Sequence, residues 1–168
     1  LAEIPPISDV HLDSSVVVEN MPAGTVVGEF SSTGSSVLTY ALVAGEGDTD
    51  NESFQIVGDQ LVTAQPLDHE LTPLKTIRVR ASDAAGSAIE LNFDVVVENV
   101  NESPTSLRLS NASIPEGLPA GTVVGLLSAT DPDDGETLTY SFASGEGSGD
   151  HEFFEIVDNE LKATTVFD

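Results

Sequence analysis

Apolar and polar side chains alternate along AIELNFDVVVEN at positions 88–99. This period of two predicts a β-strand with one buried face and one solvent-facing side. The segments VLTYALV (37–43) and KTIRVRA (75–81) show the same alternation, and Gly, Pro, Asn or Asp ends such runs at short intervals. No segment has a helical period of useful length. The pattern therefore predicts an all-β protein.

Three sequence blocks occur twice, which indicates a tandem repeat. PAGTVVG at 22–28 returns at 119–125, LTYALVAGEG at 38–47 returns as LTYSFASGEG at 138–147, and FQIVGDQLVTA at 54–64 returns as FEIVDNELKAT. We predict two domains, residues 1–101 and 102–168. The second domain ends before counterparts of the last two strands and is expected to be incomplete.

About seven short strands in the first repeat, without cysteine or tryptophan, predict an immunoglobulin-like Greek-key β-sandwich. The chain carries 29 acidic and 5 basic residues, a formal net charge of −24. Such a charge repels nucleic acid and anionic membrane surfaces and attracts cations. The absence of cysteine excludes disulfides and thiolate metal sites. No apolar run is long enough to insert into a membrane.

Five short motifs follow one another in a fixed order. They are VVEN at 17–20, LDHE at 67–70, RASD at 80–83, VENVNESP at 97–104 and ATDPDDG at 129–135. This ordered set resembles a cadherin repeat, in the form found in tandem bacterial surface proteins. The resemblance covers nearly the whole chain. It implies tandem cadherin-type β-sandwiches at an extracellular location or on the cell surface, with the export signal outside this chain.

The resemblance also implies a calcium site at the joint between the two repeats. Calcium takes six to eight oxygen ligands, many of them carboxylates. Carried over by position, the implied ligands are Glu19, Asp68 and Glu70 from the first repeat, Asn99, Asn101 and Glu102 from the linker, and Asp131 and Asp133 from the second repeat.

Two positions depart from the family pattern. Asn99 stands where aspartate is usual, a loss of charge that Glu98 could offset, and His69 replaces an arginine, a change expected to be harmless. In the family pattern, the acidic loop near the start of a repeat supplies ligands to the joint before that repeat. STGSSV at 32–37 has no acid, so a joint before the first repeat is expected to be calcium-poor or absent.

The function expected from the resemblance is cell adhesion or a calcium-rigidified spacer, without enzymatic activity. A carbohydrate-binding module is the alternative, although such sites favour exposed aromatic platforms. Homophilic contact, glycan contact and passive extension are all compatible with the sequence, as is strand exchange of the incomplete repeat with another chain. The acids of GEGDTDNES at 45–53 could form a further calcium loop, but an ordinary glycine turn is preferred because the spacing of a calcium-binding loop is incomplete.

Overall fold

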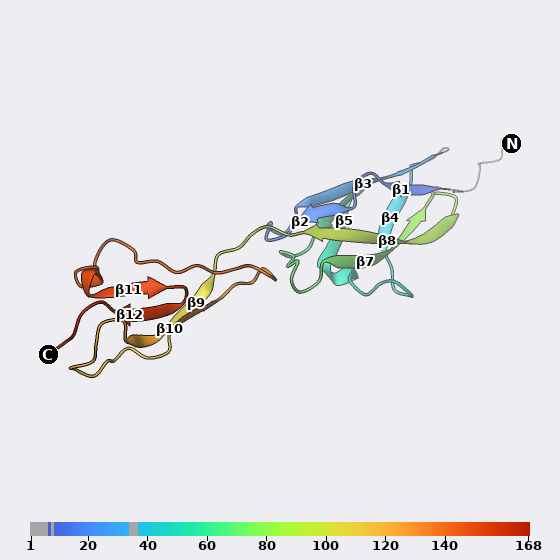
Figure 1. The fold of residues 1–168 in the computed structure, drawn as a ribbon. Coiled ribbons are helices and arrows are strands. Elements are labelled where there is room, and N and C mark those ends of the chain that lie inside the picture. Colours follow the sequence, from blue (N-terminus) through green and yellow to red (C-terminus); the bar gives the residue numbers. More distant parts are fainter. Residues whose placement is uncertain (1–6, 8, 34–36) are drawn as a thin grey trace. The chain divides into compact units, whose positions relative to one another are not determined.

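The computed structural model describes residues 7, 9–33 and 37–168, and it divides the chain into two compact units. Unit 1 is Leu1–Val100 and unit 2 is Asn101–Asp168 (Figure 1). Part of the acid-free loop, positions 34–36, and most of the first eight positions lie outside the described residues. The described residues include no helix long and apolar enough to cross a membrane.

Unit 1 is a β-sandwich of two four-stranded sheets, which confirms the predicted fold class. One sheet has the strand order β1-β3-β6-β5 and the other has the order β2-β8-β7-β4. The strands are β1 (Val10–Leu12), β2 (Val16–Val18), β3 (Val26–Ser32), β4 (Thr39–Leu42), β5 (Phe54–Val57), β6 (Gln60–Thr63), β7 (Leu74–Ser82) and β8 (Ala88–Glu98). A single 3₁₀ turn, η1 (Asn51–Ser53), precedes β5.

The long hairpin β7–β8 supplies much of the core of unit 1. Its antiparallel register runs from Leu74 opposite Val96 to Ser82 opposite Ala88. Ile77, Val95 and Val97 are fully buried, whereas the intervening residues of β8 face solvent. The alternation of the sequence at 88–98 is therefore the alternation of the two faces of β8.

The first strand region of unit 1 changes sheet between β1 and β2. β1 pairs with β3, and β2 pairs in parallel with β8. At the crossing, Asp13 Oδ1 accepts the Glu29 amide at 2.6 Å, and the register of β3 shifts between Val26 and Gly28. A Cβ on Gly28 would collide with the Ser14 carbonyl oxygen. The glycine that ends PAGTVVG is thus required by a close approach of two backbones.

Unit 2 contains a single four-stranded sheet, with the order β11-β12-β10-β9. Its strands are β9 (Thr105–Leu109), β10 (Val123–Thr130), β11 (Phe154–Val157) and β12 (Glu160–Ala163), and η2 (His151–Phe153) precedes β11. The repeated blocks match this sheet to β5-β6-β3-β1 of unit 1. Gly125 repeats the role of Gly28, because a Cβ there would collide with the Asn111 carbonyl oxygen.

Residues 139–142 of unit 2, the counterparts of β4, form no strand. In unit 1, β4 pairs with β7. The sequence reaches only Asp168, the counterpart of Asp68, so the described residues of unit 2 include no counterpart of β7. The repeated sequence LTY therefore has a strand partner in one unit and none in the other.

We predict that Gly28→Ala lowers the free energy of unfolding of unit 1 by about 1–3 kcal/mol, because the added methyl group must displace the Ser14 backbone. Urea unfolding of the whole chain measures this loss. Gly149→Ala is the control, since nothing lies within 4 Å of the Cβ that it adds. Equal midpoints for the two variants would contradict the proposed backbone contact.

Candidate metal centre

Three carboxylates from two distant parts of the sequence meet at one end of unit 1. They belong to Glu19, which follows β2, and to Asp68 and Glu70, in the turn before β7. One ligand oxygen from each lies within 4.8 Å of the other two. The structure therefore brings together all three site residues that the sequence analysis assigned to the first repeat proper.

Glu19 is the buried member of this cluster, with 2% of its surface exposed. Its Oε2 accepts the backbone N–H of His69 at 2.8 Å, and its Oε1 accepts the backbone N–H of Val100 at 2.8 Å. These two hydrogen bonds fix the orientation of the carboxylate. Each oxygen retains a lone pair with which it can bind a cation.

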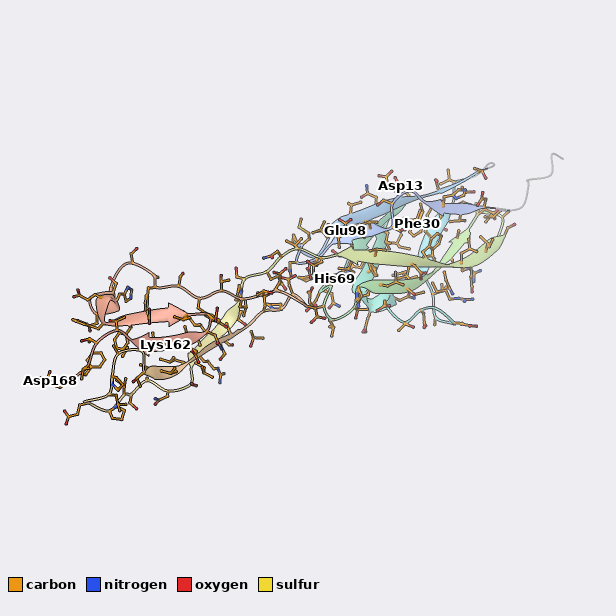
Figure 2. The ribbon with its side chains drawn as sticks, in the orientation of Figure 1. Asp13, Phe30, His69, Glu98, Lys162 and Asp168 are labelled. Carbon is orange, nitrogen blue, oxygen red and sulfur yellow. The ribbon has the colours of Figure 1, made fainter. Side chains whose placement is uncertain are left out.

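His69 attaches the turn that carries Asp68 and Glu70 to strand β8. Its Nδ1 lies 2.6 Å from the Val97 carbonyl oxygen, so Nδ1 donates the hydrogen bond. Figure 2 labels His69 and Glu98, which belong to the turn and to the end of β8. The sequence analysis assigned no role to this side chain. A lone histidine gives no signal of a backbone acceptor 28 residues away.

Asp68 and Glu70 are held by further hydrogen bonds. Asp68 Oδ1 accepts the Leu71 amide at 2.8 Å, and Glu70 Oε1 accepts Asn99 Nδ2 at 2.8 Å. Asn99 therefore lies beside the cluster and leaves its Oδ1 oxygen as a neutral ligand. Glu98, which could offset the missing charge of Asn99, is not among the three carboxylates that lie within 4.8 Å of one another.

A second group of carboxylates lies within unit 2. Asp133 is 7% exposed, and its Oδ2 accepts the Glu102 amide at 2.6 Å. Asp131 Oδ1 accepts the Asp133 amide at 3.1 Å. Asn101 Nδ2 donates to the Glu102 carbonyl oxygen at 2.9 Å. Unit 2 thus contains the remaining four predicted ligands as one locally bonded set.

The chemistry of the unit 1 cluster fits a hard divalent cation. Neither Glu19 nor Asp68 forms an ion pair with any residue that the structure describes. Two carboxylates 4 Å apart repel by about 1 kcal/mol in water and by about 4 kcal/mol at an effective dielectric constant of 20. A cation among these oxygens would reverse that repulsion, and calcium prefers carboxylate and carbonyl ligands.

The acidic loop at 45–53 has a structural role. Asp50 accepts Lys75 Nζ at 3.1 Å and the Thr76 amide at 2.9 Å, and Asp48 accepts the Gly45 amide at 3.0 Å. These bonds hold the loop against β7. The loop accordingly resembles the glycine turn preferred from the sequence, with the carboxylates of Asp48 and Asp50 already engaged.

Comparisons with known proteins give relatives of one kind, although no family model matches the chain. Human Protocadherin Fat 1 is 36% identical over 122 residues, covering 67% of this chain and 3% of that protein. Rat Protocadherin-16 is 33% identical over 151 residues, covering 79% of this chain and 4% of that protein. The chain therefore spans only a small part of the length of these relatives.

Solved structures show the same fold. Human Protocadherin-24 EC1-2 in its form II has a TM-score of 0.72 at 24% identity, covering 93% of this chain and 76% of that one. The Protocadherin GammaB4 extracellular domain has a TM-score of 0.61 at 23% identity, covering 100% of this chain and 29% of that one. The bacterial source expected from the sequence stays a prediction. Sequence relatives and solved structures together show that the chain is built from cadherin-like domains.

Proposed function

We propose that the chain is a calcium-binding cadherin-like segment of a larger extracellular protein, acting in cell adhesion or as a calcium-rigidified spacer. The observation that carries this proposal is the meeting of Glu19, Asp68 and Glu70. Glu19 is buried and bonded by two amides, so this negative charge is fixed at the site. A fixed, partly buried cluster of this kind is suited to bind a cation.

The proposed ligand set uses both units. Three carboxylates and the Asn99 oxygen are fewer than the six to eight oxygens that calcium prefers. Asn101, Glu102, Asp131 and Asp133 can supply the remainder, as the cadherin resemblance implies. Asn99 and Asn101 lie on either side of Val100, the last residue of unit 1. Ions bound by these residues would therefore restrict the motion of the segment that connects the two units.

Calcium supplies the positive charge that the acidic groups need in order to stay close together. Extracellular calcium modules bind with dissociation constants of about 10⁻⁴–10⁻³ M. At a free calcium concentration about a hundredfold above its dissociation constant, an ion stabilises the bound state by about 2.7 kcal/mol. The residues of this chain fix the ligand oxygens: two backbone amides orient Glu19, the Leu71 amide orients Asp68, and Asn99 orients Glu70.

We predict that Asp68→Asn weakens calcium binding about tenfold or more, a change that corresponds to only about 1.4 kcal/mol. Asparagine keeps an oxygen for the Leu71 amide, so the turn is expected to remain folded. Calorimetric titration of the whole chain measures the affinity. Glu52→Gln removes the same charge from an exposed position of unit 1 and should leave the affinity unchanged. Equal affinities for both variants would show that Asp68 is not a ligand.

We further predict that Asp131→Ala combined with Asp133→Ala abolishes calcium-dependent stiffening while unit 1 remains folded. Small-angle scattering with chelator and then with millimolar calcium measures the maximum dimension of the chain. Because Asp133 is buried and accepts the Glu102 amide, the pair Asp131→Asn and Asp133→Asn serves as a version that preserves side-chain volume. If the wild-type chain has the same dimensions and melting temperature under both conditions, the calcium joint does not exist.

A bead-aggregation assay distinguishes adhesion from passive spacing. If homophilic contact is the function, beads that carry the chain are expected to aggregate in millimolar calcium and to disperse with chelator. A spacer would stiffen without aggregation. Bead aggregation that persists in chelator would argue against a calcium-dependent adhesive role.

The carbohydrate-binding alternative has less support in unit 1. Tyr40 is half-buried and stacks on Phe30, with ring centroids 5.1 Å apart. Burial raises the pKa of its hydroxyl, and the nearby Asp59 charge adds to this effect. This tyrosine belongs to the core and offers no exposed platform for a sugar. Calcium-dependent binding on a glycan array would support the alternative.

A further inference from the structure

The acidic loop that follows strand β10 contains the one Asp–Gly pair of the chain, Asp134–Gly135. In such a pair the backbone nitrogen of the second residue can attack the side-chain carboxyl group of the first and close a five-membered ring. Glycine permits this attack more readily than any other residue, because it has no Cβ to crowd the ring. The sequence therefore marks this bond for a modification that needs no enzyme.

The structure leaves both reacting groups accessible. Asp134 and Gly135 are exposed and lie in a turn outside the strands. Gly135 has a φ of +84°, and nothing lies within 4 Å of the position that a Cβ would occupy. Among the residues that the structure describes, none forms a hydrogen bond or ion pair with the Asp134 carboxylate or the Gly135 N–H. Ring closure therefore breaks no existing contact of either group.

The other aspartates that precede a small residue are held by hydrogen bonds. Asp13 is followed by serine and Asp83 by alanine. Asp13 Oδ1 accepts the Glu29 amide at 2.6 Å, and Asp83 Oδ1 accepts the Ala85 and Ser87 amides at 2.9 Å each. Rotation of either carboxyl group toward the next backbone nitrogen would break these bonds. The two positions therefore serve as internal controls for the reaction.

We propose that the Asp134–Gly135 bond isomerises spontaneously to a β-linked isoaspartate. The Gly135 nitrogen attacks Cγ of the Asp134 carboxylic acid, a C–N bond forms, and the amide proton and one carboxyl oxygen leave as water. Water then adds to the main-chain carbonyl carbon of Asp134, its bond to nitrogen breaks, and the nitrogen regains a proton. One water is released and one is consumed, so the mass is unchanged. The main chain gains one carbon, and the former main-chain carbonyl becomes the carboxylate.

The modified bond directly follows the residue after Asp133, which holds the loop in place. Asp133 is 7% exposed, its Oδ2 accepts the Glu102 amide at 2.6 Å, and its own amide donates to Asp131 Oδ1 at 3.1 Å. An added main-chain carbon changes the path of the loop beside this buried group, and hydrogen bonds weaken steeply when their geometry is lost. Isomerisation therefore releases Asp133 from Glu102. This effect is confined to unit 2 and requires no bound ion.

Mass spectrometry of the aged chain tests the reaction. The whole chain is kept with chelator at neutral pH and physiological temperature, then digested, and its peptides are fragmented by electron transfer, which distinguishes isoaspartate from aspartate. We expect isoaspartate to form at Asp134 at least about tenfold faster than at Asp13 or Asp83, a difference of only about 1.4 kcal/mol in the barrier. Equal rates at the three positions, or no isoaspartate at Asp134, would overturn the proposal.

Asp134→Glu is the matched variant, since glutamate keeps the charge but closes a six-membered ring much more slowly. Asp134 is exposed, so the fresh variant should melt at the same temperature as the wild-type chain. After ageing, amide hydrogen exchange at Glu102 should be faster in the wild-type chain and unchanged in the variant. If ageing accelerates this exchange equally in both, or in neither, Asp133 is not released by isomerisation and the proposed effect on the loop is wrong.

One further expectation rests on the proposed function, because the same loop carries Asp131 and Asp133. An ion bound by these carboxylates would restrain the loop, so millimolar calcium should slow isomerisation at Asp134 and leave the rate at Asp13 unchanged. Isomerisation that proceeds equally with calcium and with chelator supports the present proposal and counts against Asp131 and Asp133 as ligands. Absence of isomerisation in chelator overturns the present proposal and leaves the calcium site unaffected.

Discussion

The structure of one end of unit 1 depends on the hydrogen bonds that the buried carboxylate of Glu19 accepts. A charge removed from water is costly unless hydrogen bonds or a counter-ion compensate it. Here the His69 and Val100 amides provide the hydrogen bonds, and through them Glu19 connects the end of β2, the turn before β7 and the last residue of unit 1. The same side chain therefore organises the fold and presents the oxygens of the candidate metal centre.

The two units show how one sequence pattern behaves with and without a partner sheet. Gly28 and Gly125 make the same close backbone approach, so this approach is a local property of the repeat. The burial of a side chain, in contrast, depends on segments that are distant in the sequence. Leu61 is fully buried and Leu161 is half-buried, although their neighbouring sequences match, because the sequence ends at Asp168, before any counterpart of the β7–β8 hairpin that packs in the core of unit 1.

The alternation of apolar and polar residues along the chain was sufficient to predict the all-β class. The five ordered motifs were sufficient to indicate cadherin-like domains. The motifs also selected Glu19, Asp68 and Glu70, which the structure brings together. Other features depend on contacts between distant segments, which a pattern does not contain. The His69 bond to Val97 and the Lys75 bond to Asp50 are of this kind, as is the loss of a strand at 139–142.

The parallel pairing of β2 with β8 has a mechanical consequence. Val16 is opposite Val96 and Val18 is opposite Glu98, so a strand near the start of unit 1 runs beside its last strand in the same direction. Tension that pulls the two ends of the unit apart would slide these strands along each other, loading their hydrogen bonds in shear. Bonds loaded in shear share the force and break together, whereas bonds at the end of a hairpin open one at a time. Under such tension, the β2–β8 pair of unit 1 would therefore carry the load in shear.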